Sequence, residues 1–148
     1  MCVVLENDGL AKAAPQMQFR KAFRVMDQVM NFIPEEMKMV LTKESLKDIK
    51  EHFRTCRECR LGVGIGKGVY AERQALQEAF ESPWFDHRLE ESPACLALIA
   101  TGIGMEHLVE PLLQDLASRM PATSVIYTSR TDPDLQDRVQ ATVLIGLK

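Results

Sequence analysis

The stretch "RLGVGIGKGVYAERQ", Arg60 to Gln74, decides how this chain folds. Apolar residues alternate with three glycines in its first half, and a lysine and a helical run follow. Glycines, a lysine and the start of a helix are also the parts of a phosphate-binding loop. The spacing argues against that use, because a P-loop ends in Gly-Lys-Ser/Thr and Lys67 is followed by Gly68. A dinucleotide fingerprint would need its third glycine at position 67, where the lysine stands.

The alternation instead predicts a β-strand with one bare face. Its odd-numbered positions carry apolar side chains and its even-numbered positions carry none, so a helix or another backbone can approach closely. Outward from this strand, the spacing of apolar residues predicts the other elements. We expect strands at 2–5, 94–100, 123–129 and 139–147, and helices at about 19–33, 45–53, 70–81 and from Val109 onward.

This order predicts an α/β fold with two layers. We expect a mixed four-stranded sheet with helices packed mainly on one face, preceded by a long connecting helix and a short leading strand. The leading strand has no obvious partner, and a buried strand needs its backbone groups paired. Either it joins the sheet by a long crossover, or it belongs to a sheet made by residues outside this chain.

Composition narrows the class of protein. The 148 residues fit one domain of ordinary size. With 26% charged residues and a net charge of -3, the chain has no large excess of positive charge that would attract nucleic acid or anionic lipid. There is no run of eighteen apolar residues and no signal-peptide pattern at the start. The expectation is a cytoplasmic protein with no nucleic acid partner and no direct membrane contact.

Cys56 and Cys59 form the string "CREC", and His52 precedes Cys56 by one helical turn. A zinc site would need a second pair of ligands, and the other cysteines and histidines are scattered. A redox pair should lie between a strand and a helix start, whereas these cysteines follow a helix and precede a strand. We therefore expect structural thiols and no metal site. A small α/β enzyme that uses this region, with Glu51 and His52, remains an alternative, although no nucleophile–base–orienter set is evident.

Five strings, in collinear order, resemble the carboxy-terminal half of FtsZ, the tubulin-like GTPase of bacterial cell division. They are "VVLENDGL", "KAFRVMDQVM", "LGVGIGKGVYAERQALQEAFESPWFD", "LALIATGIG" and "DPDLQDRVQATVLIGL". The resemblance implies that residues 1–34 are a last strand and central helix, and that residues 35–148 are the FtsZ/tubulin-like C-terminal domain. The family's phosphate loop, Gly-Gly-Gly-Thr-Gly-Thr-Gly, does not occur in the sequence. The expected cofactor is therefore none in this chain, and GTP if the GTP-binding domain is present.

The resemblance also implies site residues. Phe23 and Asp27 match the central-helix positions that stack on guanine and accept from its N–H groups; the alternative is a core ring and a solvated carboxylate. In the loop that enters the neighbouring subunit's pocket the family reads Asn-x-Asp-Phe-x-Asp. Here Lys43 and Ser45 replace its first two polar residues, and only Asp48 remains as a catalytic candidate, with Glu44 one position off. The substitutions put hydrolysis in doubt, because such carboxylates position the attacking water.

The functional expectation is a divergent FtsZ-like assembly domain. It would take part in filament formation or cell division through contacts with other FtsZ-like subunits or filament proteins, and it would not be a GTPase on its own. One alternative is a stand-alone interaction module that regulates FtsZ-type filaments. The small α/β enzyme that uses Cys56 and Cys59 ranks last.

Overall fold

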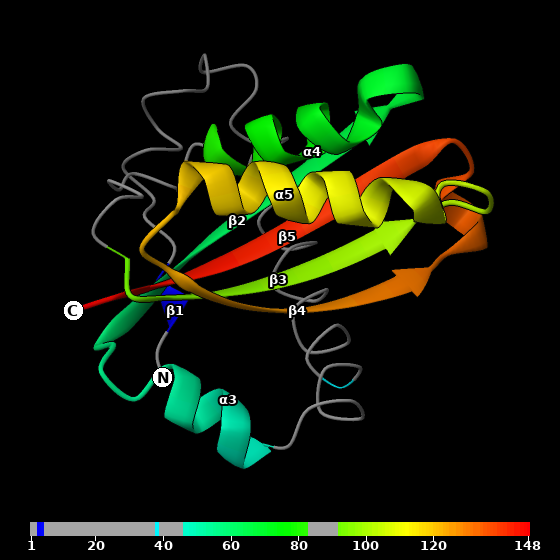
Figure 1. Cartoon of the computed structure of the whole chain (residues 1–148). Helices are drawn as coiled ribbons and strands as arrows, with labels where there is room; N and C mark the ends of the chain where they lie inside the picture. The colour runs from blue at the N-terminus through cyan, green and yellow to red at the C-terminus, as the bar shows by residue number, and fades with distance from the viewer. Residues whose placement is uncertain (1–2, 5–37, 39–45, 83–91) are drawn as a thin grey trace, which may run out of the picture.

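The computed structural model describes residues 3–4, 38, 46–82 and 92–148. Its helices and strands are drawn in Figure 1. In chain order they are β1 (Val3–Val4), α3 (Leu46–His52), β2 (Glu58–Lys67), α4 (Ala71–Phe80), β3 (Ala94–Thr101), α5 (Val109–Arg119), β4 (Ser124–Thr131) and β5 (Arg138–Leu147). Short 3-10 turns at Gly68–Tyr70, Glu106–Leu108 and Pro133–Leu135 connect some of them. Among the described residues no helix is long and apolar enough to cross a membrane.

The strands form one sheet in the order β1-β2-β5-β3-β4. Strand β5 pairs antiparallel with β2 and β3, and β3 pairs parallel with β4. The mixed α/β sheet expected from the sequence is therefore confirmed. The leading strand adds a fifth, two-residue strand: Val3 and Val4 pair parallel with Cys59 and Arg60 of β2. Of the two possibilities for this strand, the long crossover is the one found.

The bare face of β2 receives helix α4. A β-carbon built on Gly64 would lie less than 3.0 Å from the Ala75 carbonyl oxygen, and one on Gly66 equally close to that of Ala71. Both contacts are with the helix backbone, so α4 lies directly on the glycines. The predicted close approach is confirmed, and it explains why this stretch needs residues without side chains.

Polar side chains of α4 and the turn after it cover the outer edge of β2. Strand β1 pairs with only two residues of β2, Cys59 and Arg60. Further along β2, the outward N–H groups need side chains as hydrogen-bond partners. Three of them donate to side-chain oxygens. The bonds join Val63 to Ser82 Oγ (3.2 Å), Ile65 to Glu78 Oε2 (3.1 Å) and Lys67 to Gln74 Oε1 (3.1 Å). The Ser82 hydroxyl also donates to the Val63 carbonyl, at 3.1 Å.

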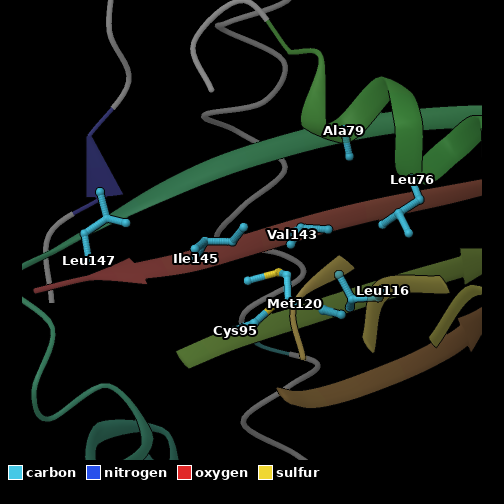
Figure 2. Packing of buried hydrophobic residues seen from close by; sticks show 9 residues of the cluster. Leu76, Ala79, Cys95, Leu116, Met120, Val143, Ile145 and Leu147 are labelled. Carbon is cyan, nitrogen blue, oxygen red and sulfur yellow. The ribbon is translucent and has the colours of Figure 1, made fainter. Parts of the chain in front are cut away.

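Helices α4 and α5 cover one face of the sheet, and α3 packs on the opposite face (Figure 1). Figure 2 shows the core under α4 and α5, where Leu76 and Leu116 meet Val143 and Ile145 of β5. The predicted alternation along β5 is thus confirmed. On the other face Leu144 packs with residues of α3, so both faces contribute to the core.

Most predicted boundaries hold within a few residues. Helix α5 begins at Val109, with Pro111 in its first turn, where a missing N–H costs nothing. Strand β2 begins at Glu58, three residues before the predicted start, because pairing with β1 and with Leu147 of β5 extends it. The predicted long helix at 19–33 lies outside the described residues.

Candidate functional site

Helix α3 carries the one described residue of the predicted site, Asp48. Two apolar residues on its inner side, Ile49 and Phe53, are buried against Leu61 and Leu144 of the sheet. Their spacing of four residues places them on one helical face, as predicted. This packing fixes which side of the helix is turned outward, and Asp48 lies on that exposed side.

His52 locks the helix in place. Its Nε2 lies 3.0 Å from the Cys95 carbonyl oxygen of β3, and its ring meets the Phe53 ring edge-on at 5.0 Å between centroids. Just after the helix, the Arg57 N–H donates to the Leu147 carbonyl at 2.8 Å. These bonds tie α3 to β3 and the segment after the helix to β5, the central strand of the sheet. His52 therefore has a structural partner in the sheet.

The outward side of α3 is charged. A shallow depression of about 510 Å³ is lined by Lys47, Lys50, Glu51 and Arg54. Arg54 Nε lies 3.0 Å from Glu51 Oε1, with both side chains largely exposed. An exposed pair of this kind stabilises a fold by about 1 kcal/mol at most, so these charges are available for contact with another surface. The two lysines of this lining, Lys47 and Lys50, could meet an anionic group of another molecule.

The structure does not describe the other residues of the predicted site. Phe23 and Asp27, expected at a nucleotide base, lie outside the described residues, as do Lys43 and Ser45 of the loop before α3. Their roles therefore stay predictions.

The three cysteines that the structure describes pack as apolar residues. Cys59 is fully buried in β2, and the half-buried Cys56 lies over Gly146 of β5, where any β-carbon would collide with its sulfur. Cys95, in β3, is also buried, and this burial raises the pKa of its thiol to about 12. In the described part of the chain no three His, Cys, Asp or Glu side chains gather as metal ligands. The raised pKa keeps the Cys95 thiol neutral at ordinary pH, which makes it a poor nucleophile.

Sequence reasoning missed a second depression, between α4 and α5. Its volume is about 470 Å³, and Glu72, Asp115 and Arg119 are among its lining residues. Arg119 donates to both Asp115 oxygens at 3.1 Å. Glu72 is only 7% exposed, and its Oε2 has no hydrogen-bond partner. A glutamate in the first turn of a helix is usually solvated, so nothing in the sequence indicates its burial.

Comparison with known proteins agrees with this arrangement. No protein-family model matches the chain. The cell division protein FtsZ 1 of Archaeoglobus fulgidus is 23% identical over 99% of the chain and 42% of its own length. A solved structure titled as an empty FtsZ dimer of M. jannaschii superposes with a TM-score of 0.83 at 20% identity, over 97% of this chain and 44% of that one. The fold is that of the carboxy-terminal part of FtsZ.

A more distant neighbour has the same fold. CetZ2 from Haloferax volcanii, solved as a GTPγS-bound protofilament, superposes with a TM-score of 0.57 at 12% identity, over 98% of this chain and 45% of that one. The resemblance to FtsZ inferred from the five strings is confirmed. The chain spans less than half the length of each of these relatives, and it matches their carboxy-terminal portion.

Proposed function

We propose that this chain is the assembly domain of a divergent FtsZ-like protein, taking part in filament formation or cell division in the cytoplasm. The observation that carries the proposal is the superposition of 97% of the chain on the carboxy-terminal part of an FtsZ structure, with a TM-score of 0.83. The proposed partners are other FtsZ-like subunits. Solved relatives described as a dimer and as a protofilament support this choice.

The exposed side of α3 is the proposed contact surface. Lys47, Asp48, Lys50 and Arg54 are all exposed there, while the opposite side of the helix is held by buried Ile49 and a sheet contact. Charges around a contact steer association and set its register more than they add affinity. A charge reversal on this surface should therefore weaken assembly without unfolding the domain.

The chain would also contribute residues to GTP sites that it does not form by itself. Phe23 and Asp27 would complete a guanine pocket, and Asp48 would hold the attacking water at a neighbour's GTP. The substitutions at Lys43 and Ser45 leave one carboxylate where the family has two, so hydrolysis should be slow. By itself the chain should bind GTP no better than roughly millimolar, because one helix face does not enclose a base.

Co-assembly tests the contact. The chain is added to polymerising FtsZ 1 of Archaeoglobus fulgidus with GTP, and polymer is measured by sedimentation and light scattering. We expect the chain to sediment with the polymer and to lower its yield. Lys50→Glu on α3 should abolish both effects, whereas Arg73→Glu on α4 reverses a charge that is also exposed, on the other face of the sheet, and should leave them intact. A chain that never enters the pellet, or a Lys50→Glu variant as active as the wild type, would refute the proposal.

Hydrolysis is tested by restoring the family's loop. The chain is fused behind the GTP-binding domain of the same relative, with and without Lys43→Asn and Ser45→Asp. A second carboxylate near the attacking water should raise GTP turnover by roughly tenfold or more. Equal turnover with normal assembly would show that another residue, such as Glu44, already positions the water.

A further inference from the structure

The depression between α4 and α5, called the α4–α5 groove below, is lined by charged and polar residues. It lies on the face of the sheet opposite α3 (Figure 1). Its volume of about 470 Å³ is within the range of small-molecule sites. Pro111 apart, every lining residue is polar or charged. A groove of this composition suits a charged ligand, and the sign of the ligand's charge depends on which lining charge lacks a partner.

Both arginines of the groove already have partners. Arg119 donates to both oxygens of Asp115 at 3.1 Å, and its guanidinium carbon lies 5.7 Å from the centre of the Phe80 ring. The guanidinium carbon of Arg73 lies 5.9 Å from the centre of the Tyr70 ring. A cation over an aromatic face at such distances is attracted by the ring. These contacts leave the remaining acid of the groove without a close cation.

That acid is Glu72. It is 7% exposed, and its Oε2 has no hydrogen-bond partner. Arg73 Nε lies 3.9 Å from Oε1, which is too long for a hydrogen bond. A buried carboxylate without donors is costly for the fold, because its hydration is lost and nothing replaces it. Glu72 therefore favours a ligand that brings a positive charge and N–H donors.

The donor set selects an ammonium over a metal ion or a guanidinium. Divalent ions need several oxygen ligands, and within the described ranges no group of three His, Cys, Asp or Glu side chains comes together. Asp115 adds none, because both of its oxygens accept from Arg119. A guanidinium bound by two parallel hydrogen bonds needs both oxygens of one carboxylate, whereas Oε1 of Glu72 faces Arg73. An ammonium is a compact point charge and can bind at Oε2 alone.

We propose that the α4–α5 groove binds an aliphatic ammonium group, with the Glu72 carboxylate as its acceptor. The group comes from a free amine or from a lysine side chain of another protein, since both carry it on an apolar stem. Arg73 swings aside to admit it, because its side chain is 73% exposed and an exposed ion pair adds little to stability. The groove lies across the sheet from α3, so the proposal is independent of the filament contact.

Titration of the full chain with two probes tests the proposal. One is the diamine cadaverine, and the other is a glycine–lysine–glycine peptide with blocked ends. The nuclear magnetic resonance signals of the backbone amides report binding. At least one probe should bind with a dissociation constant of roughly a millimolar or less, and the signals that shift should centre on the first turn of α4 and on residues 114–119. The tighter probe identifies the source of the ammonium, and pentanediol, the same stem without charge, should not bind.

Two variants locate the acceptor. Glu72→Gln keeps the shape of the side chain and removes its charge, so the dissociation constant should rise roughly tenfold or more. Glu81→Gln is the matched control, because it removes an exposed carboxylate at the other end of α4 and should leave binding unchanged.

Three results would overturn the proposal. The first is that neither probe binds, or that the shifts of the wild type centre elsewhere, which holds even where a variant does not fold. The second is a Glu72→Gln protein that binds as tightly as the wild type. The third is that calcium or magnesium chloride produces the same shifts at lower concentration than either amine, which would assign the groove to a metal ion.

Discussion

Replacing Gly64 by alanine tests the packing that organises the whole domain. The added β-carbon would lie less than 3.0 Å from the Ala75 carbonyl oxygen, the Ala79 nitrogen and the Glu78 β-carbon. The first two are backbone atoms of α4, which the bond from Ile65 to Glu78 ties to this strand. The helix therefore has to shift as a body, because no flexible side chain can move aside.

Whether Gly64→Ala raises or lowers stability shows whether Gly64 is closely packed or is an ordinary strand glycine. In an uncrowded strand, exchanging glycine for alanine stabilises a protein by about 0.5–1 kcal/mol. Inserting a carbon into a packed contact costs about 1–3 kcal/mol, so the net change should be a loss of about 1–2 kcal/mol. For a chain of this size, this corresponds to a midpoint of thermal unfolding lower by roughly 2–8 °C.

Calorimetry measures the midpoint, and amide hydrogen exchange locates the change. In Gly64→Ala the Ile65 amide should exchange faster, because its bond to Glu78 depends on the position of α4. Gly68→Ala is the matched control: no atom lies within 4 Å of its β-carbon, and its positive φ of 79° adds only local strain. That variant should lose stability with no faster exchange at Ile65. A Gly64→Ala protein that melts at or above the wild-type temperature would refute the close packing of α4 on β2.

Three further predictions follow from single residues. Glu78→Ala should lower the free energy of unfolding in urea by about 1 kcal/mol and speed exchange at the Ile65 amide, because that N–H loses its acceptor; an unchanged midpoint would show that water replaces the carboxylate at no cost. The hydrogen bond from Arg130 lowers the pKa of Asp132, so this carboxylate stabilises the fold above its ordinary pKa and the contribution is lost as acid protonates it through the lowered value. Arg130→Gln should therefore flatten the fall of stability in acid, measured by urea titration at a series of pH values, and an equally steep fall would count against the pair. Burial raises the pKa of Cys95 from 9.0 to about 12, so stability should be full below pH 9.0 and decline as pH rises toward 12. Cys95→Ala should remove part of that alkaline decline; an unaltered alkaline profile would contradict it.

Much of the fold is predictable from local pattern. The three glycines of β2 predict a close helix contact, and the apolar spacing of α4, α5 and β5 predicts which faces are buried. For the candidate site, the sequence predicts that Ile49 and Phe53 point inward. It therefore also predicts which side of α3 is turned outward. These predictions succeed because apolar residues spaced three to four apart in a helix, or two apart in a strand, lie on one side, and that side is the one that meets the core.

The sequence by itself determined the elements, their order and their buried faces, because those depend on residues close together in the chain. Only the tertiary structure decided the pairings between distant segments. Val3 joins Cys59 through a parallel crossover, and such pairing leaves no local mark in either strand. Glu72 is buried because α5 packs beside α4, and its own neighbours in sequence do not require it. The places of β1 and β4 at the two ends of the described sheet likewise depend on strand order, which is a property of the assembled sheet and of no single segment.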